Sequence, residues 1–550
     1  MPNSVSEIQG ETVVYAARRI ITMEPTQPDA THVAVRDGRI LAVGGPDVAD
    51  AWGPARRDDR FRDAVILPGF VEAHSHMMTG ALWDYLYCGN VDRMDPDGKV
   101  WAGISTVEEL IDRMKTAIEA LPEGKPLYCW GFDPLFFAGE RLNRRHLDQA
   151  AIDRPIAVMH QSFHLMTVNS QALSLAAYDS NTNAEGVVRF PDGTPSGELQ
   201  EMAAMFPIMR RLDVQMQTLA QGEHAIRQFG KAAVQTGVTT ATDLYAALED
   251  AEVETLLQVT AADDYPLRIV PALGVIGMDP NVAAQRALAL RARSTDRLRM
   301  GICKVMTDGS IQGFTARVKW PGYINGAANG LWNLEPDRLK EMVRVLHAAG
   351  LNMQMHTNGD EASELMLDAI EEATVLHPNS DNRHTLQHCQ MAGEDQFYRM
   401  ARLGVCCNLF ANHLWYYGDA HVEFTLGRDR AARMNACRSA LDNGVTLAIH
   451  SDSPVTPMGP LHVAWCAVNR VTPKGRVLGP NQKLSVPEAL HAVTLGAART
   501  LKLDRDIGSI TPGKAADFAV LGDDPLTVAP EALRDIAVLG TVQAGRVFTR

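Results

Sequence analysis

The sequence predicts an α/β protein: a (β/α)8 TIM-like barrel, a small composite β-sandwich domain built from both termini, and an insertion after barrel strand 1. Three observations support this fold class. Helix and strand patterns alternate through the middle of the chain. Both ends are rich in short strands, and residues 92–220 interrupt the alternation. The predicted domains are 1–66 and 506–550 for the two parts of the sandwich and 67–505 for the barrel.

Strand patterns fill residues 11–66. Residues 34–44 give two strands joined by Asp37-Gly38, and an Asp-Gly pair is a strong hairpin signal. At the other end of the chain, residues 517–521 and 541–548 also have strand patterns. Two β-rich ends that flank a long α/β middle suggest one β domain assembled from both termini.

The middle of the chain alternates amphipathic helices with short apolar strands. The helix pattern from Glu335 to Ala349 stops at Gly350, a typical residue just after a helix. The last helix, 485–501, begins with the capping-box residues Ser485 and Glu488. The eight strand candidates are 70–76, 238–243, 267–273, 301–306, 351–356, 384–388, 404–409 and 445–450.

Residues 92–220 contain a helix from Thr106 to Leu121 and a loop rich in Pro, Gly and Asp at 191–198. They do not continue the alternation, so we interpret them as an insertion after the first barrel strand. Loops at this face of a barrel shape the substrate pocket.

Composition limits the class of protein. The chain has 550 residues, 46% of them hydrophobic and 21% charged, which is typical of a soluble globular enzyme. A net charge of -14 disfavours nucleic acid and anionic membranes as partners. The eight cysteines form no C-x-x-C pair, which favours a reducing compartment, and we expect a cytoplasmic protein. No apolar run predicts a membrane span, and residues 1–10 lack the apolar core of a secretory signal.

Polar residues follow several of the predicted strands. His74 and His76 are two positions apart, so on a strand their imidazoles point to one face. A single H-x-H pair is weak evidence for a metal site. The ends of later strands add four more polar residues, however, and all these ends meet at one barrel mouth: Lys304, His356, His388 and Asp452. Nitrogen and oxygen groups of this kind form a metal-ligand set.

Several motifs together resemble the amidohydrolase superfamily, specifically the amidohydrolase 3 or YtcJ-like branch, which includes N-substituted formamide deformylase. The motifs lie at 67–76, 164–169, 192–197, 237–240, 304–310, 356–360, 387–390, 451–455 and 508–517. Three positions depart from the family pattern: Glu72 replaces the usual Asp, Gln387 the usual Glu, and His450 the usual Gly. They bear on substrate choice rather than on metal binding.

The resemblance implies a binuclear metal centre, most often with zinc. His74, His76 and Asp452 would bind the more buried ion, and His356 and His388 the second. A lysine ammonium has no lone pair for a metal. In related enzymes this lysine is carboxylated by CO2, and the resemblance implies the same bridging N6-carboxylated lysine at Lys304. The implied metal ligands are therefore His74, His76, Lys304, His356, His388 and Asp452. The alternative is an unmodified Lys304 beside a single ion.

The implied reaction is hydrolysis of an amide, N-substituted formamide or cyclic amide. Two ions about 3.5–4 Å apart acidify a water to hydroxide, which attacks the carbonyl. Asp452 would act as general base and then as general acid toward the leaving nitrogen. Four further residues could contact substrate, although each also fits a purely structural role: Asp308, Arg317, His164 and Trp130. We expect three other histidines to serve packing or the surface: His160, His413 and His450.

Two other functional classes stay open. The same metal barrel could run ester hydrolysis, deamination or non-oxidative decarboxylation, because a fold does not fix a reaction. Less favoured is a metal-free scaffold without catalysis. The expected partner is a small-molecule substrate, with no nucleic acid and no membrane, and a homodimer is a further expectation.

Overall fold

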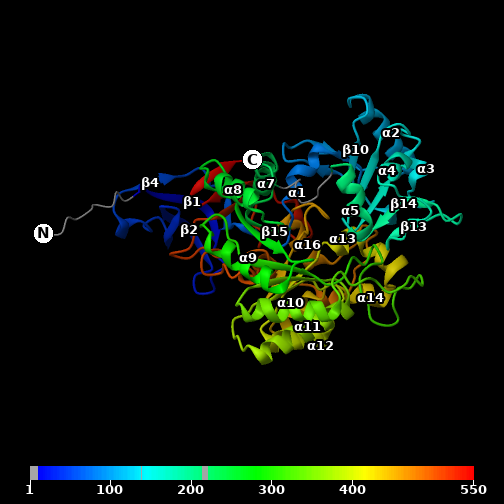
Figure 1. Ribbon diagram of the computed structural model, residues 1–550. Helices are drawn as coiled ribbons and strands as arrows, with labels where there is room; N and C mark the ends of the chain where they lie inside the picture. The colour runs from blue at the N-terminus through cyan, green and yellow to red at the C-terminus, as the bar shows by residue number, and fades with distance from the viewer. Residues whose placement is uncertain (1–9, 138, 214–220, 550) are drawn as a thin grey trace.

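The computed structural model describes residues 10–137, 139–213 and 221–549 (Figure 1). The sequence expectation for residues 1–9, a polar start without a secretory signal, lies outside the described residues. The end of the predicted insertion, residues 214–220, lies outside them as well.

Eight parallel strands form the central sheet, and all eight were predicted. Adjacent strands in the sheet follow chain order throughout, as expected for a barrel of β/α units. The strands are β6 (Phe70–Glu72), β15 (Val238–Ala246), β16 (Arg268–Gly274), β17 (Ile302–Met306), β18 (Met353–Thr357), β19 (Thr385–His388), β20 (Cys406–Leu409) and β21 (Leu447–Ile449).

The first and last strands meet at the carboxyl rim of this sheet. Ser75 and Ser453 form a parallel bridge. The backbone N–H of His76 donates to the Ser453 carbonyl at 2.7 Å, and that of Asp452 donates to the His74 carbonyl at 3.1 Å. The segments that follow β6 and β21 therefore lie side by side, which confirms the α/β TIM-like fold.

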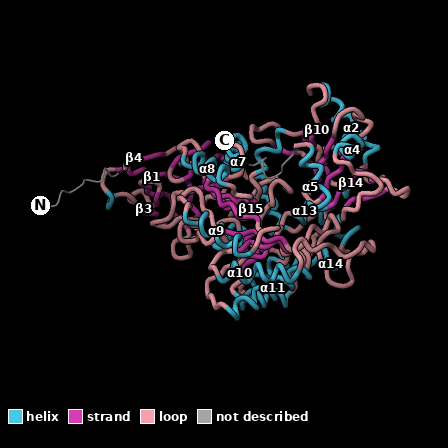
Figure 2. The backbone as a smooth tube through the Cα atoms, viewed as in Figure 1, coloured by secondary structure: helices cyan, strands magenta, loops and turns pink. Residues whose placement is uncertain are grey.

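Helices cover the outside of the sheet (Figure 2). The predicted helix 335–349 is α10, which begins after Glu335 and is followed by Gly350 with a φ of 65°. The helices that follow the barrel strands are α7 (Glu223–Gln235), α8 (Asp250–Ala261), α9 (Pro280–Ala292), α10 (Pro336–Ala348), α11 (Asp360–Leu376), α12 (Glu394–Leu403), α13 (His413–Ala420), α14 (Arg428–Arg433), α15 (Cys437–Asp442) and α16 (Pro460–Asn469).

The predicted helix 485–501 is two helices, α17 (Val486–Ala492) and α18 (Leu495–Thr500). The expected capping box at Ser485 and Glu488 is present at the start of α17. The chain turns at Thr494, and α18 then packs against β6, β20 and β21. Gly496 permits this close approach, since a Cβ there would lie 2.3 Å from the Leu447 carbonyl oxygen.

Strands from both termini join in one sheet. In this sheet β22 pairs antiparallel with β5, so that Ala519 lies opposite Leu67. The hairpin at Asp37-Gly38 is present, with positive φ at both residues, as a type I′ turn requires. The strands are β1 (Thr12–Ile21), β2 (Asp29–Arg36), β3 (Arg39–Gly44), β4 (Ala55–Asp58), β5 (Val65–Pro68), β22 (Phe518–Leu521), β23 (Val538–Gln543) and β24 (Arg546–Thr549). The domain boundaries stay a prediction.

The segment between β6 and β15 has its own six-stranded sheet, in the order β13-β14-β12-β11-β10-β7. The sequence predicted an insertion here but no sheet, and its first strand precedes the predicted start at 92. The strands are β7 (Leu86–Tyr87), β10 (Leu127–Phe132), β11 (Ile156–His160), β12 (Leu165–Val168), β13 (Val187–Arg189) and β14 (Pro195–Gln200), with a separate ribbon of β8 (Arg93–Met94) and β9 (Val100–Trp101). The helices are α1 (Met78–Ala81), α2 (Val107–Glu119), α3 (Arg144–Leu147), α4 (Ser170–Leu175) and α5 (Glu201–Arg211).

The insertion is attached to the loop that follows the last barrel strand. The guanidinium of Arg93 donates to the carbonyls of Pro454 and Val455 at 2.6 and 2.9 Å, and the Gln161 amide donates to Val455 at 2.7 Å. These bonds hold the insertion over the carboxyl rim of the barrel. No helix in the described part of the chain has the length and apolar character needed to cross a membrane.

A buried ion pair links the barrel to the terminal sheet. The guanidinium of Arg268 in β16 pairs with the carboxylate of Asp517, just before β22. Arg268 also donates to Thr240 Oγ1 at 3.0 Å, and Asp517 accepts from the Ala544 N–H at 2.8 Å. Both side chains are about 95% buried, with exposed fractions of 5% and 4%.

We predict that Arg268→Met lowers the free energy of unfolding by about 3–5 kcal/mol, because it leaves the Asp517 carboxylate buried without its cation. Equilibrium unfolding in urea measures this loss. The control is Arg293→Met, whose partner Glu254 is 69% exposed; it should cost about 0–1 kcal/mol. Equally small losses in both variants would show that the buried pair does not stabilise the junction.

Candidate metal centre

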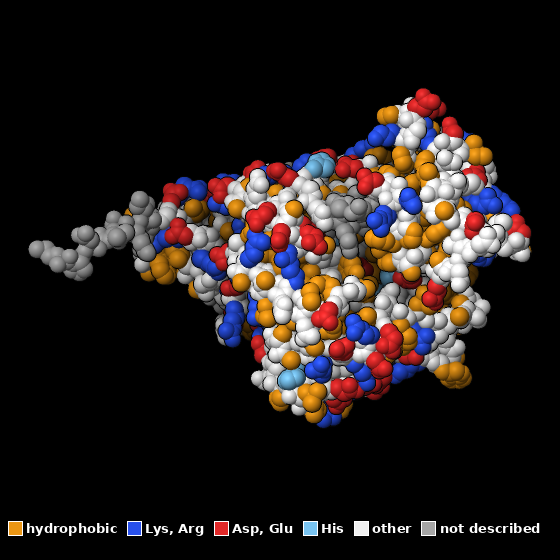
Figure 3. Space-filling model, in the orientation of Figure 1, with side chains coloured by type: hydrophobic (Ala, Val, Ile, Leu, Met, Phe, Trp, Pro, Cys, Tyr) orange, Lys and Arg blue, Asp and Glu red, His pale blue; other side chains and the backbone are white. Residues whose placement is uncertain are grey.

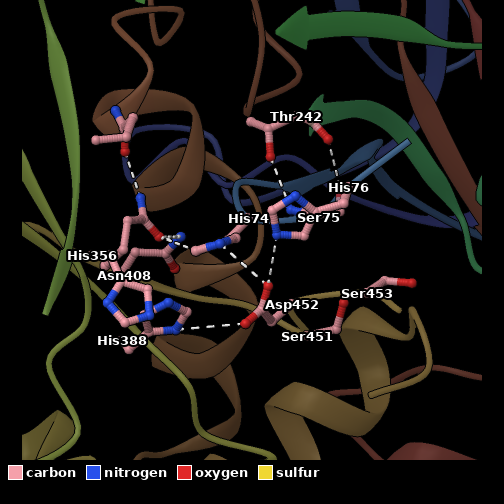
Figure 4. Close-up of polar contacts among 12 residues, drawn as sticks. His74, Ser75, His76, Thr242, His356, His388, Asn408, Ser451, Asp452 and Ser453 are labelled. Carbon is pink, nitrogen blue, oxygen red and sulfur yellow. Dashed lines mark hydrogen bonds and ion pairs between the residues drawn. The ribbon is translucent and has the colours of Figure 1, made fainter. Parts of the chain in front are cut away.

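The barrel rim brings the six predicted ligands to one place. In Figure 4 the rings of His74, His76 and His388 surround the carboxylate of Asp452. Oδ1 of Asp452 lies 3.2 Å from Nε2 of both His74 and His76, and Oδ2 lies 3.8 Å from Nδ1 of His388. Nζ of Lys304 lies 3.5 Å from Nε2 of His74. The ring of His356 packs against that of His388, with centroids 4.6 Å apart, so this residue joins the same group.

The amide of Gln387 sets the orientation of His74. Its Oε1 lies 2.6 Å from Nδ1 of His74 and also accepts from the Asn408 amide at 3.0 Å. An amide oxygen can only accept, so Nδ1 of His74 carries the proton. The lone pair is then at Nε2, which faces Asp452. Gln387, a departure from the family pattern, therefore holds the ring of His74 in one orientation.

Asp308 does the same for His356. Its Oδ1 lies 3.2 Å from Nδ1 of His356, which directs the lone pair of that ring to Nε2. The carboxylate also accepts from the backbone N–H groups of Asn358, Gly359 and Arg317 at 2.9–3.0 Å. Asp308 is fully buried and is not among the residues that line the cavity described below. Its position indicates support of His356 rather than substrate contact.

Two buried atoms of this group make no hydrogen bond of suitable geometry: Nδ1 of His388, and Oδ1 of Asp452 despite the two ring nitrogens 3.2 Å away. Unpartnered polar atoms are costly to bury, and an ion would satisfy both. His388 and Asp452 also have positive φ values, 69° and 52°. Non-glycine residues rarely adopt this backbone, and such strain is concentrated at functional sites. The donor set and these orphaned atoms fit a divalent ion bound by imidazole and carboxylate.

Burial sets the ionisation of the centre. Desolvation, with a contribution from the nearby Lys304, lowers the pKa values of His74 and His388, so both rings are neutral and have a free lone pair. Desolvation also lowers the pKa of Lys304 to about 7, against a smaller opposing effect of Asp452. Desolvation opposes ionisation of Asp452, but His76 and the other nearby groups outweigh it and lower the pKa of this carboxyl.

Glu72, the second departure from the family pattern, lies beneath the centre. Its carboxyl accepts from Ser451 Oγ at 2.7 Å and from the His74 N–H at 3.4 Å. Burial raises the pKa of Glu72 to about 8, despite these hydrogen bonds. Through these hydrogen bonds Glu72 connects the segments that follow β6 and β21.

His450 was expected to serve packing or the surface and was not placed in the group of predicted ligands. It is fully buried and packed, and it stacks on His74, one of those ligands, with ring centroids 4.6 Å apart. Ligand atoms of His74, His388 and His450 all lie within 4.8 Å of one another. The signal was present in the sequence, since His450 is two positions before Asp452, as His74 is before His76.

A cavity with an empty volume of about 1030 Å³, including its open mouth, lies over the centre. His164 of the insertion lines it, as predicted for a substrate-contacting residue. Nδ1 of His164 bonds the Glu201 carboxylate at 3.0 Å, which leaves Nε2 as the ring nitrogen free for a ligand. The rest of the wall is largely apolar: Met78, Met159, Phe163, Met202, Met205, Leu244, Tyr245, Ile276, Met306 and Val455.

Two predicted substrate residues do not reach this cavity. The guanidinium of Arg317 pairs with Glu361 at 2.9 Å and lies over the ring of Trp332. Trp130 is buried inside the insertion, edge-on to Trp83, with ring centroids 5.1 Å apart. Neither is among the lining residues, so the structure gives no support for substrate contact by either side chain. Both were inferred from their place in the sequence, which does not fix the direction of a side chain.

Comparison with known proteins agrees with this architecture. The model of the amidohydrolase family matches residues 62–549. YtcJ of Bacillus subtilis (strain 168) is 26% identical over 96% of this chain and 97% of its own length. The N-substituted formamide deformylase of Arthrobacter pascens is 25% identical over 95% of this chain and 96% of its own length.

The fold also matches solved structures. An uncharacterized metal-dependent hydrolase from Pyrococcus horikoshii OT3 superimposes with a TM-score of 0.72 and 20% identity, covering 94% of this chain and 99% of that one. The family match covers the whole barrel together with the strands that return to the terminal sheet. The chain therefore belongs to the amidohydrolase family, in its YtcJ-like branch.

Proposed function

We propose that this protein is a metal-dependent hydrolase of a carbon–nitrogen bond in a neutral amide, N-substituted formamide or cyclic amide. The observation that carries the proposal is the group of imidazoles around Asp452, with ligand atoms that are buried and have no hydrogen-bond partner. Family membership and the similarity to a formamide deformylase support the choice of bond.

In this proposal His74, His76 and Asp452 hold one ion, and His356 and His388 hold a second. Imidazole and carboxylate ligands favour zinc. Bound ions supply an acidified water and polarise the substrate carbonyl. The carboxylate of Asp452, ionised because its pKa is lowered, would take a proton from water and give it to the leaving nitrogen.

Lys304 is the proposed bridging ligand, after reaction with CO2. Carboxylation requires a neutral amine, and burial lowers the pKa of Lys304 to about 7, so much of the amine is neutral at physiological pH. The Nζ atom lies 3.5 Å from Nε2 of His74, within the same group of ligands. A lysine ammonium has no lone pair and cannot bind a metal ion. A carbamate on Lys304 would supply carboxylate oxygens that can.

The cavity wall indicates which substrates fit. Five methionines contribute to it, and methionine adapts its flexible side chain to varied apolar groups. Lys304 is the one lysine or arginine among the lining residues in the described part of the chain. No arginine is therefore placed to bind a substrate carboxylate, and we propose a substrate with an uncharged, apolar substituent.

The first test is amine release from N-substituted formamides. His74→Ala should lower kcat/KM by about 100-fold or more, because loss of a ligand exceeds the 10–100-fold effect of removing a supporting residue. The control is His224→Ala, a histidine on α7 whose side chain is 64% exposed. The control should keep wild-type activity, and equal activity in all three proteins would exclude His74 from the reaction.

The modification of Lys304 can be observed directly. We expect a carbamate signal in carbon-13 NMR after incubation with labelled bicarbonate and zinc, and its loss in Lys304→Met. The signal should be stronger at pH 8 than at pH 6, because the amine with a pKa of about 7 is mostly neutral only above that pH. A wild-type protein with no signal at either pH would favour an unmodified lysine.

Substrate polarity is tested with a matched pair, N-hexylformamide and 6-formamidohexanoate, which share the scissile bond. The wild type should prefer the neutral compound by about tenfold or more, since apart from Lys304 in the proposed metal centre no lysine or arginine lines the cavity to pair with the distal carboxylate. Met202→Arg introduces a cation at a lining position that is 44% exposed. It should reduce this preference by about two- to fivefold, which is the contribution expected of a partly exposed ion pair between the new guanidinium and the substrate carboxylate.

The matched control is Phe206→Arg, one helical turn along α5. Phe206 is 49% exposed and is not among the lining residues, and hydrophobic side chains gather over this part of the insertion in Figure 3. This variant should leave the preference unchanged. Equal rates on the two formamides in the wild type would contradict the proposed apolar substrate.

A further inference from the structure

His450 occupies an unusual position within the barrel. Its ring is sandwiched between two others: it stacks on His74 at 4.6 Å and 20°, and on Phe410 at 4.7 Å and 25°. The ring of His388 meets it edge-on, with centroids 5.1 Å apart. Two of the three neighbours of His450 are therefore proposed metal ligands.

Both ring nitrogens of His450 are buried and lack a hydrogen-bond partner. A neutral imidazole has one donor and one acceptor, and burying both without partners is unfavourable. Packing alone does not account for a histidine here, because a phenylalanine would fill the same aromatic stack without this penalty. Two other buried histidines, outside the proposed ligand set, do have partners: His413 contacts Gln390 at 2.7 Å, and His421 contacts Thr425 at 2.8 Å.

The neighbours of His450 are suited to share an ion with it. One ligand atom each of His74, His388 and His450 lies within 4.8 Å of the others, and all three side chains are buried. His74 also belongs to a second such group, with His76 and Asp452. The two groups share His74, whose one available lone pair, at Nε2, can be given to a single ion.

We propose that His450 is a direct ligand of the divalent transition-metal ion that His74 holds, on the side of the centre where the ligand atom of His388 lies within 4.8 Å of both. This inference rests on the proposed metal centre and extends it: the ligand shell would include an imidazole from the last barrel strand in addition to the four predicted histidines. His450 is not among the residues that line the cavity. An ion bound to His450 would therefore lie deeper in the barrel than an ion bound only by cavity-lining residues.

A crystal structure of the zinc-loaded protein, with anomalous diffraction at the zinc edge, tests the contact directly. We expect an ion about 2.0–2.2 Å from a ring nitrogen of His450, the usual zinc–imidazole distance. Zinc bound at the rim but more than about 3 Å from both ring nitrogens, or a water bonded to His450 in place of an ion, would overturn the proposal.

His450→Phe provides the test in solution, because it keeps the aromatic stack and removes both nitrogens. The visible spectrum of the cobalt-substituted protein reports the ligands of the ion and needs no substrate. We expect the variant to show altered bands and to bind cobalt at least about 100-fold more weakly than the wild type, beyond the effect of a supporting residue.

The control is His160→Phe, a buried histidine of the insertion that also has one unpartnered nitrogen; its spectrum should match the wild type. Thermal unfolding of the metal-free proteins checks that each variant folds. Cobalt bands and affinity identical in His450→Phe and the wild type would overturn this inference alone. Failure of the wild type to bind cobalt or zinc would instead overturn the proposed function together with it.

Discussion

The contact between the first and last barrel strands is the constraint on which the centre depends. The N–H of His76 donates to the Ser453 carbonyl, and the N–H of Asp452 donates to the His74 carbonyl. These two bonds join residues that are almost 380 positions apart. They place the only predicted carboxylate ligand between two imidazoles of the opposite end of the barrel. Any change that opens this closure would separate Asp452 from His74 and His76 together.

A buried polar network supports the centre from below. The Gln354 amide donates to the Thr500 carbonyl of α18 at 3.1 Å, and Gln387 links Gln354 to His74. Hydrogen-bonded side chains in a buried network hold one another in a single arrangement. Here the network fixes which nitrogen of His74 carries the proton. The barrel interior therefore orients the ligands, whereas the insertion, bonded to the loop after β21, forms the wall above them.

Much of the fold could be predicted because barrel strands are short apolar runs in regular alternation with helices. The convergence of the six predicted ligand residues could be predicted because each lies at the end of such a strand, and parallel strand ends converge; that they bind metal stays a prediction. The sheet of the insertion could not be predicted, since its strands are only two to six residues long and lack a clear alternation.

Arg317 and Trp130 were placed near the site by sequence position. The side chain of Arg317 points to Glu361, however, and that of Trp130 lies in the interior of the insertion. The spacing of His450 and Asp452 in the chain is one signal for His450, but the stacking of His450 on His74 is a contact across the barrel that this spacing does not show.

The central claim is that the rim of this barrel binds divalent metal. Elemental analysis of the purified, unmodified protein tests it most directly, because it requires neither a substrate nor a variant. The account predicts between about one and two equivalents of a divalent transition metal, with zinc preferred, as expected for a centre of imidazole and carboxylate ligands. Less than about one tenth of an equivalent after growth in zinc-supplemented medium would contradict it, since a structural or catalytic centre of this kind retains its ion through purification.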